Sequence, residues 1–119
     1  MRLLALATVL PALLFGAAAA HAHAQLDHAS PRVGGTVAPA PRTVSLWFTE
    51  KLEPAFSTIE VTNAAGARVE QGRARLGGDR TVLQVGLKPL PPGTYSVHWR
   101  VLSVDSHVTE GRFSFQVGQ

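Results

Sequence analysis

The amino-acid sequence predicts an all-β fold, a sandwich or a barrel of short and largely antiparallel strands. Segments in which apolar and polar residues alternate are separated about every ten residues by Gly, Pro, Asn or Asp, which is typical of small β-proteins. Beyond residue 22, no stretch repeats apolar residues with the spacing of an amphipathic helix. The connections are too short for crossover helices, so antiparallel pairing is expected.

Residues 1–22 are predicted to be a cleaved secretory signal peptide. They contain a basic residue at Arg2, an apolar run and a stretch of small residues rich in alanine. Cleavage after Ala20 or after Ala22 satisfies the preference for small residues, and either cut leaves a histidine first. We favour the cut after Ala22, which leaves residues 23–119, 97 of the 119 residues, as one domain with a single core.

At least five strands and an amino-terminal edge segment account for this domain, and about seven strands are expected in all. The predicted elements, in order, are an edge segment at residues 23–31 and strands within residues 43–50, 57–63, 77–87, 89–105 and 111–117. Turns are expected at Asn63–Gly66, Gly77–Asp79 and Pro91–Gly93, because these residues favour turn conformations.

Apolar residues at every second position of the strands define the faces that point into the core. The predicted inward residues are Val44, Leu46, Phe48, Ile59, Val61, Leu83, Val85, Leu87, Tyr95, Val97, Trp99, Val101, Phe113, Phe115 and Val117. One continuous apolar core between strands is therefore expected to hold the domain together.

Composition excludes several kinds of site. The chain has no cysteine, which excludes thiolate zinc sites, blue-copper sites and cysteine nucleophiles. Its one methionine is Met1, so the processed protein has only nitrogen and oxygen to offer a metal. Without Arg2, ten of the eleven Lys and Arg remain against eight Asp and Glu, a net charge of +2 that is too small and too scattered to indicate nucleic-acid binding.

An acid and an imidazole lie two residues apart in VDSHVTEG, between the last two predicted strands. If the backbone stays extended there, Asp105 and His107 point to the same face. The pair would then form part of a metal site, although Asp105 could instead cap a turn and His107 could be a solvated loop residue.

A histidine at the start of the processed chain can chelate a metal through its α-amine and its imidazole. An amino-terminal His23 would supply two nitrogens, His107 a third and Asp105 an oxygen. Cu(II) prefers such a set of three nitrogens and one oxygen in a square arrangement. Zinc could use the same atoms as a tetrahedron. Cleavage before His21 would instead produce a copper or nickel site made from the amine, backbone amides and His23 alone.

Three segments resemble the CopC family of periplasmic copper-binding proteins. These are HAQLDHASPRVGG near the start, VSLWFTEKLEPAFSTIEVTNAAGARV in the centre and LPPGTYSVHWRVLSVDSHVTEGRFSFQV near the end. The last is the most specific, since it contains Ser-x-Asp-x-His followed by Phe-Ser-Phe. Together the segments cover essentially all of residues 23–118.

The resemblance implies a Greek-key β-sandwich, cupredoxin-like or immunoglobulin-like, that holds one Cu(II) per chain. It implies that His23, Asp105 and His107 are the copper ligands. Glu50 matches an acid near the copper of some relatives, which makes it an outer ligand or a hydrogen-bond partner. Some members also hold Cu(I) in a methionine-rich site, which this sequence lacks, so binding of Cu(II) alone is expected.

The expected function is that of a periplasmic Cu(II) carrier or buffer in copper homeostasis or resistance, and not an enzyme. The resemblance implies a CopD-type inner-membrane copper transporter as partner, and the chain is expected to be a monomer. Two alternatives stay open: a copper-dependent oxygenase, which would also use an amino-terminal histidine, and a structural β-sandwich without metal.

Other polar residues are expected to lie outside the site. His28 is predicted at a solvated edge position, and His98 alternates with inward residues and therefore faces solvent. Arg100 could pair with Glu110 or Asp105, but a surface pair of this kind contributes little to stability.

Overall fold

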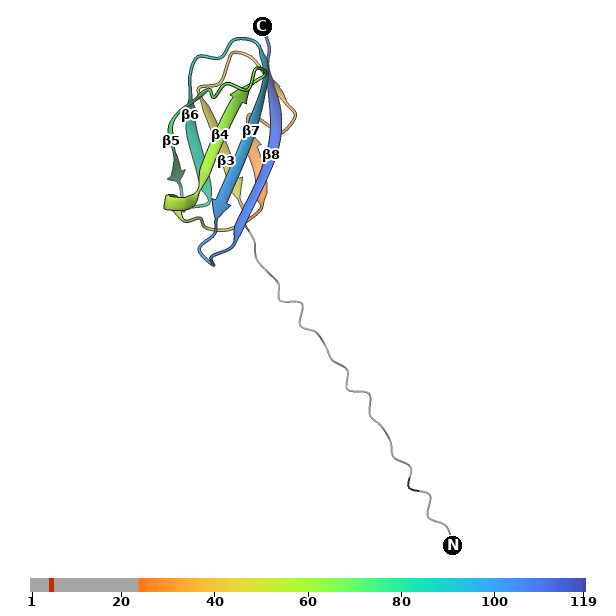
Figure 1. Ribbon diagram of the computed structural model, residues 1–119, viewed down its shortest axis with the longest axis vertical. Coiled ribbons are helices and arrows are strands. Elements are labelled where there is room, and N and C mark those ends of the chain that lie inside the picture. The colour runs from red at the N-terminus through yellow and green to blue at the C-terminus, as the bar shows by residue number, and fades with distance from the viewer. Residues whose placement is uncertain (1–4, 6–23) are drawn as a thin grey trace.

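The computed structural model describes Ala5 and residues 24–119, and two four-stranded β-sheets packed face to face make up the domain (Figure 1). The strands are β1 (Leu26–Ser30), β2 (Thr36–Val37), β3 (Thr43–Phe48), β4 (Thr58–Asn63), β5 (Glu70–Gly77), β6 (Val82–Leu87), β7 (Gly93–Leu102) and β8 (Val108–Val117), with a short 3₁₀ helix η1 (Pro54–Phe56). The predicted all-β sandwich is confirmed, with eight strands against about seven expected. Within this described part, no helix is long and apolar enough to cross a membrane.

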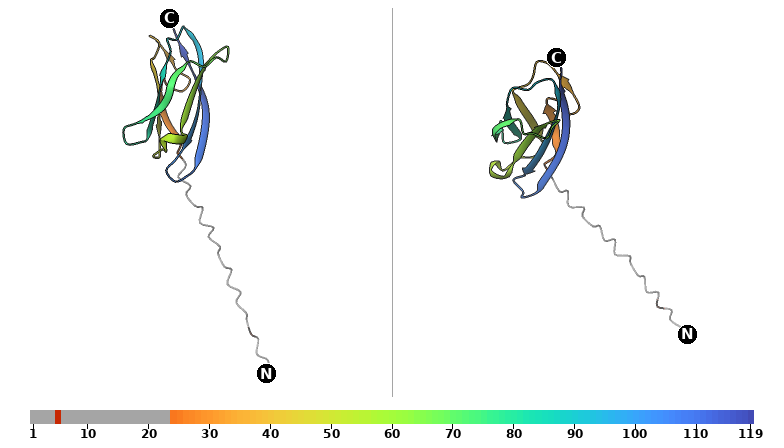
Figure 2. Two further views of the ribbon diagram at one scale, coloured as in Figure 1. Left: turned by 60° about the vertical axis from the view of Figure 1, so that its left-hand side comes forward. Right: turned by 45° about the horizontal axis from the view of Figure 1, so that its top comes forward.

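The strand order is β1-β3-β6-β5 in the first sheet and β2-β8-β7-β4 in the second. Every pair is antiparallel except β2 and β8, which run parallel. The chain passes from one sheet to the other at every connection except β5 to β6 and β7 to β8, so neighbours in sequence often lie in opposite layers. Figure 2 shows these two layers from the side.

The core lies between the sheets, where the apolar residues of each strand meet. All predicted inward residues are buried except Phe113, which is half-buried and packs against the core. Two aromatic contacts link the layers and neighbouring strands: Phe48 meets Trp99 edge to face at 5.1 Å between ring centroids, and Tyr95 stacks on Phe115 at 5.5 Å. This packed interior makes the sandwich a rigid support for the loops at its ends.

Strands β2 and β5 were not predicted. β5 escapes the alternation pattern because it is irregular: its pairing with β6 shifts register between Gln71 and Arg75, around Gly72 with a φ of +78°. The turn predicted at Asn63–Gly66 is present, closed by a hydrogen bond from the Gly66 N–H to the Asn63 carbonyl at 2.9 Å.

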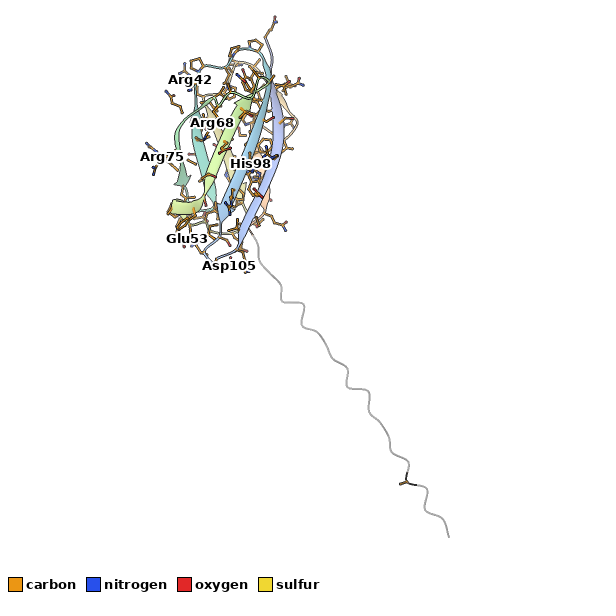
Figure 3. All side chains as sticks on the ribbon, in the orientation of Figure 1. Arg42, Glu53, Arg68, Arg75, His98 and Asp105 are labelled. Atoms are coloured by element: carbon orange, nitrogen blue, oxygen red, sulfur yellow. The ribbon has the colours of Figure 1, made fainter. Side chains whose placement is uncertain are left out.

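Several loops come together at one end of the sandwich, called here the Asp105 end and labelled in Figure 3. It consists of residues 24–25, 49–57, 78–81 and 103–107. Backbone hydrogen bonds tie these segments to one another, among them Leu52 N–H to the Arg80 carbonyl at 2.9 Å and Val104 N–H to the Lys51 carbonyl at 3.0 Å. The first described residues of the domain therefore lie at the same end as the β7–β8 connection.

Candidate metal centre

The β7–β8 connection is a tight turn that brings Asp105 and His107 together. The backbone is not extended as predicted: Ser106 has a φ of +71°, and the Ser103 N–H donates to the His107 carbonyl at 3.0 Å. The turn rather than the strand pleat makes the two side chains converge, with His107 Nδ1 3.2 Å from Asp105 Oδ2. Both side chains are partly exposed, at 40% and 42%, so an ion from solvent can reach this end of the molecule.

Ser103 stabilises the charged form of the Asp105 carboxyl. It is fully buried at the base of the turn, and its hydroxyl donates a hydrogen bond to Asp105 Oδ1. This hydrogen bond is the main cause of a lowered pKa at Asp105, opposed by partial burial and reinforced by the neighbouring His107. Asp105 is therefore a carboxylate at neutral pH, the form that binds metal ions.

The start of the domain is held beside β8. Ala24 is fully buried, and its carbonyl accepts a hydrogen bond of 2.6 Å from the Thr109 hydroxyl, two residues beyond His107. On the other side, Gln25 and Thr49 exchange two hydrogen bonds, from Gln25 N–H to Thr49 Oγ1 at 3.0 Å and from Thr49 N–H to the Gln25 carbonyl at 2.9 Å. Residues 24–25 are thus clamped between the end of β3 and the start of β8.

The predicted ligand His23 lies outside the described residues, and so does His21 of the alternative site. Glu50 is half-buried and follows Thr49 directly, so it belongs to the Asp105 end. Within residues 24–119, no group of three or more His, Asp or Glu could hold a metal ion. The pair Asp105 and His107 is therefore a partial donor set, and the metal roles of these residues and of Glu50 stay predictions.

The other two described histidines have partners away from this end. His28 stacks on Trp47 with 4.4 Å between ring centroids, and its Nδ1 lies 2.6 Å from Asp27 Oδ2. His28 is therefore exposed at the first sheet's edge strand, as predicted, and the ring has a packing role there.

His98 faces outward from the second sheet between two acids, with its Nε2 3.1 Å from Glu110 Oε2 and its Nδ1 3.8 Å from Glu60 Oε2. It is only 26% exposed at the side chain, less than its position in the alternation suggested. Glu110 lies across from Arg100 in the strand register, yet in the described part of the chain its carboxylate pairs with His98 and not with Arg100.

Reasoning from the sequence missed the residues that position the site. Ser103 is part of the Ser-x-Asp-x-His pattern, but the pattern alone assigns it no role. No motif in the neighbouring sequence identifies Thr49 or Thr109, because their role depends on hydrogen bonds with residues 24–25, which are distant in sequence. A hydroxyl side chain becomes recognisable as a clamp only when its partner is known.

Comparison with known proteins agrees with the arrangement of strands. The CopC domain profile matches residues 26–118. The chain is 37% identical over 123 residues to a copper resistance protein C of Xanthomonas campestris pv. juglandis, covering 98% of this chain and 96% of that protein.

Two solved structures have the same fold. CopC from Methylosinus trichosporium OB3b has a TM-score of 0.74 and 36% identity, covering 80% of this chain and 93% of that one. PcoC, a methionine-rich copper resistance protein from Escherichia coli, has a TM-score of 0.72 and 32% identity, covering 82% of this chain and 100% of that one. From the strand arrangement, the profile match and these relatives, we conclude that the chain belongs to the CopC family.

Proposed function

We propose that this protein is a periplasmic Cu(II) carrier or buffer that takes one cupric ion at the Asp105 end. In this proposal residues 1–22 are a signal peptide, and the new amino terminus supplies the amine and imidazole of His23. His107 supplies a third nitrogen and Asp105 an oxygen, with Glu50 as an outer ligand or a hydrogen-bond partner. The observation that carries the proposal is the clamp on Ala24, since it holds the residue next to His23 against Thr109, two residues beyond His107.

The donor atoms that are described suit a cupric ion. Two donors on adjacent corners of a square, each about 2.0–2.1 Å from the metal, lie about 2.9 Å apart. His107 Nδ1 is buried and lies 3.2 Å from Asp105 Oδ2, so the two groups already converge and the imidazole would have to shift to share an ion with the carboxylate. Asp105 would be a carboxylate near neutral pH even with its ordinary pKa, and the hydrogen bond from Ser103 lowers that pKa further, so no proton has to leave when the ion arrives.

The relatives support copper as the cargo, and the composition of this chain favours Cu(II). Similar proteins include copper resistance protein C of Xanthomonas campestris pv. juglandis and PcoC, a copper resistance protein from Escherichia coli. PcoC is described as methionine-rich, whereas Met1 is the only methionine of this chain and would leave with the signal peptide. Without thioether ligands the protein has no soft donors for Cu(I), so we propose binding and transfer of Cu(II) only, by a monomer that delivers to a CopD-type inner-membrane transporter.

The direct test combines mass spectrometry of the exported protein with electron paramagnetic resonance of its Cu(II) complex. We expect His23 as the first residue, one Cu(II) per chain and nitrogen couplings that include the terminal amine. His107→Ala should weaken Cu(II) binding by orders of magnitude while the apo fold is retained. A chain that starts at His21, or a His107→Ala variant with nearly unchanged affinity, would contradict the proposed ligand set.

A second variant separates the amine from the side chains. One glycine inserted before His23 moves the terminal amine away from the imidazole and keeps every side chain in the protein. Affinity should then fall as strongly as in His107→Ala, because the chelate ring of one residue is lost. If the inserted glycine leaves affinity unchanged, ligation uses side chains alone.

A further inference from the structure

A group of basic residues lies on the side of the sandwich formed by β3, β5 and β6. This basic face consists of Arg42, which precedes β3, Arg73 and Arg75 on β5, and Lys88, which follows β6; all four are exposed. In Figure 3 the labelled side chains of Arg42 and Arg75 project outward from this side, while Asp105 lies at the far end.

Strand pairing gathers these cations although they are scattered in the sequence. The Leu87 N–H donates to the Arg42 carbonyl at 2.9 Å, which sets Arg42 beside Lys88. Arg75 pairs with Gln84 across the β5–β6 ladder, and the register shift that begins at Gln71 lifts the chain around Arg73 from the sheet. Two shallow hollows result, which both include Gln71.

The hollows are lined by basic, amide and apolar groups. One has a volume of about 250 Å³ and includes Arg42 and Lys88, and the other has a volume of about 310 Å³ and includes Arg73 and Arg75. No carboxylate lines either hollow among the described residues. The basic face therefore presents four positive charges around two open depressions.

The nearest acid does not neutralise this face. The Glu70 side chain is only 6% exposed, and its carboxylate accepts a hydrogen bond of 3.0 Å from the Val61 N–H on the opposite sheet. Arg68 pairs with the same carboxylate. Within residues 24–119, none of the four cations of the basic face forms an ion pair.

The acids concentrate elsewhere and give the molecule an electrical polarity. Four of the eight Asp and Glu residues lie in loops of the Asp105 end, namely Glu50, Glu53, Asp79 and Asp105, against two cations there, Lys51 and Arg80, so this end has a net charge of −2 with histidine neutral. A charged surface that approaches the protein is therefore attracted by one side and repelled by another, which orients the molecule before contact.

We propose that the basic face is a docking surface for anionic phospholipid headgroups. The cations are spread over neighbouring strands and two open hollows, a layout that meets many phosphates of a surface and does not enclose a single small anion. Cations near an anionic membrane contribute additively, and the attraction extends over about one Debye length. Docking in this way leaves the Asp105 end uncovered, so it does not compete with a metal ion there.

Vesicle cosedimentation of the processed protein tests the proposal. The vesicles contain either phosphatidylglycerol and phosphatidylcholine in equal amounts or phosphatidylcholine alone. We expect binding only to the anionic vesicles at about 0.01 M ionic strength, and loss of binding at about 1 M, where the Debye length falls to about 3 Å. The double variant Arg73→Gln/Arg75→Gln should lower the partition coefficient roughly 30-fold, since two cations are removed.

A matched control distinguishes this face from net charge. The double variant Arg100→Gln/Arg112→Gln removes two exposed cations from the outer face of the other sheet and should change partitioning by less than about threefold. An equal loss in both variants, or equal binding to neutral vesicles, would overturn the proposal. Millimolar inorganic phosphate at constant ionic strength should not change vesicle binding. If phosphate abolishes vesicle binding, the basic face is a site for free phosphate and not for a membrane surface.

Discussion

The hydrogen bond between Thr109 and Ala24 is predicted to set the affinity for Cu(II) without contacting the ion. Thr109→Val replaces the hydroxyl by a methyl of similar size, so the buried Ala24 carbonyl loses its partner at 2.6 Å. A buried acceptor that is left without its hydrogen bond costs about 1–2 kcal/mol. Residue 24 should then detach from β8 in the apo protein, because this hydrogen bond joins its carbonyl to that strand.

Copper binding would have to restore this order, so the same free energy appears as lost affinity. At 1.4 kcal/mol per factor of ten, the dissociation constant should rise roughly 5- to 30-fold. The assay is a Cu(II) competition titration against a chromogenic chelator, with urea unfolding of the apo protein in parallel. Thr109→Ser keeps the hydroxyl and serves as the control, with affinity near that of the wild type.

Unchanged affinity for Cu(II) in Thr109→Val would contradict this role of Ala24. If Thr109→Val loses stability by the expected amount and keeps its affinity for Cu(II), then the position of residue 24 does not matter to the ion. The amino terminus would then not be part of the site. If Thr109→Ser also loses affinity for Cu(II), the shape of the threonine side chain, and not its hydrogen bond, is the cause of the loss.

Three further predictions concern the core, an internal carboxylate and the reaction class. Gly111→Ala places a Cβ 2.5 Å from Trp99 Cζ2 and should destabilise the fold by about 1–3 kcal/mol in urea, with changed tryptophan fluorescence. Burial raises the pKa of Glu70, but hydrogen bonds from the Val61 and Glu70 backbone and the interaction with Arg68 outweigh it and lower the pKa overall. The free energy of unfolding should therefore decrease as the pH drops below about 4.5, and Glu70→Gln should lack this part of the pH dependence. The copper-loaded protein with a reductant should not oxidise chitin or cellulose.

Gly118→Ala meets only ordinary contacts, the nearest at 3.6 Å, and should be nearly neutral; similar losses in both variants would mean that the indole of Trp99 is not the cause. For Glu70 the sign follows from the lowered pKa, since its contribution is present above the unfolded value and lost below the folded one. Identical pH profiles of wild type and Glu70→Gln would remove that explanation, and sustained turnover of polysaccharide would make the protein an oxygenase.

Alternation of apolar residues was sufficient to predict most of the architecture. It identified the inward faces of β3, β4, β6, β7 and β8, because burial between two sheets requires an apolar residue at every second position. It failed for β5, where the register shift around Gly72 interrupts the period, and for β2, whose two residues are too few to show one. The pattern therefore works where strands are regular and long.

The candidate site was predicted from the sequence only in part. Asp105 and His107 are close enough in the chain to be recognised as a pair, although the turn at Ser106, and not an extended strand, joins their side chains. The hydroxyl of Ser103 lowers the pKa of Asp105, but the sequence showed Ser103 only as the first residue of the Ser-x-Asp-x-His motif, without a role. Local sequence identifies candidate donors, but it does not state which conformation presents them.

The order of residues along the chain establishes which side chains form the core and which donor atoms are present: nitrogen and oxygen donors, no thiol, and a single methionine ahead of the domain. Tertiary structure decided which distant residues meet. It placed the Ala24 carbonyl on Thr109, 85 positions away, and gathered Arg42, Arg75 and Lys88 onto one side of the sandwich. The physical reason is that alternation depends on near neighbours in the chain, whereas these contacts depend on how two sheets pack and how their loops close.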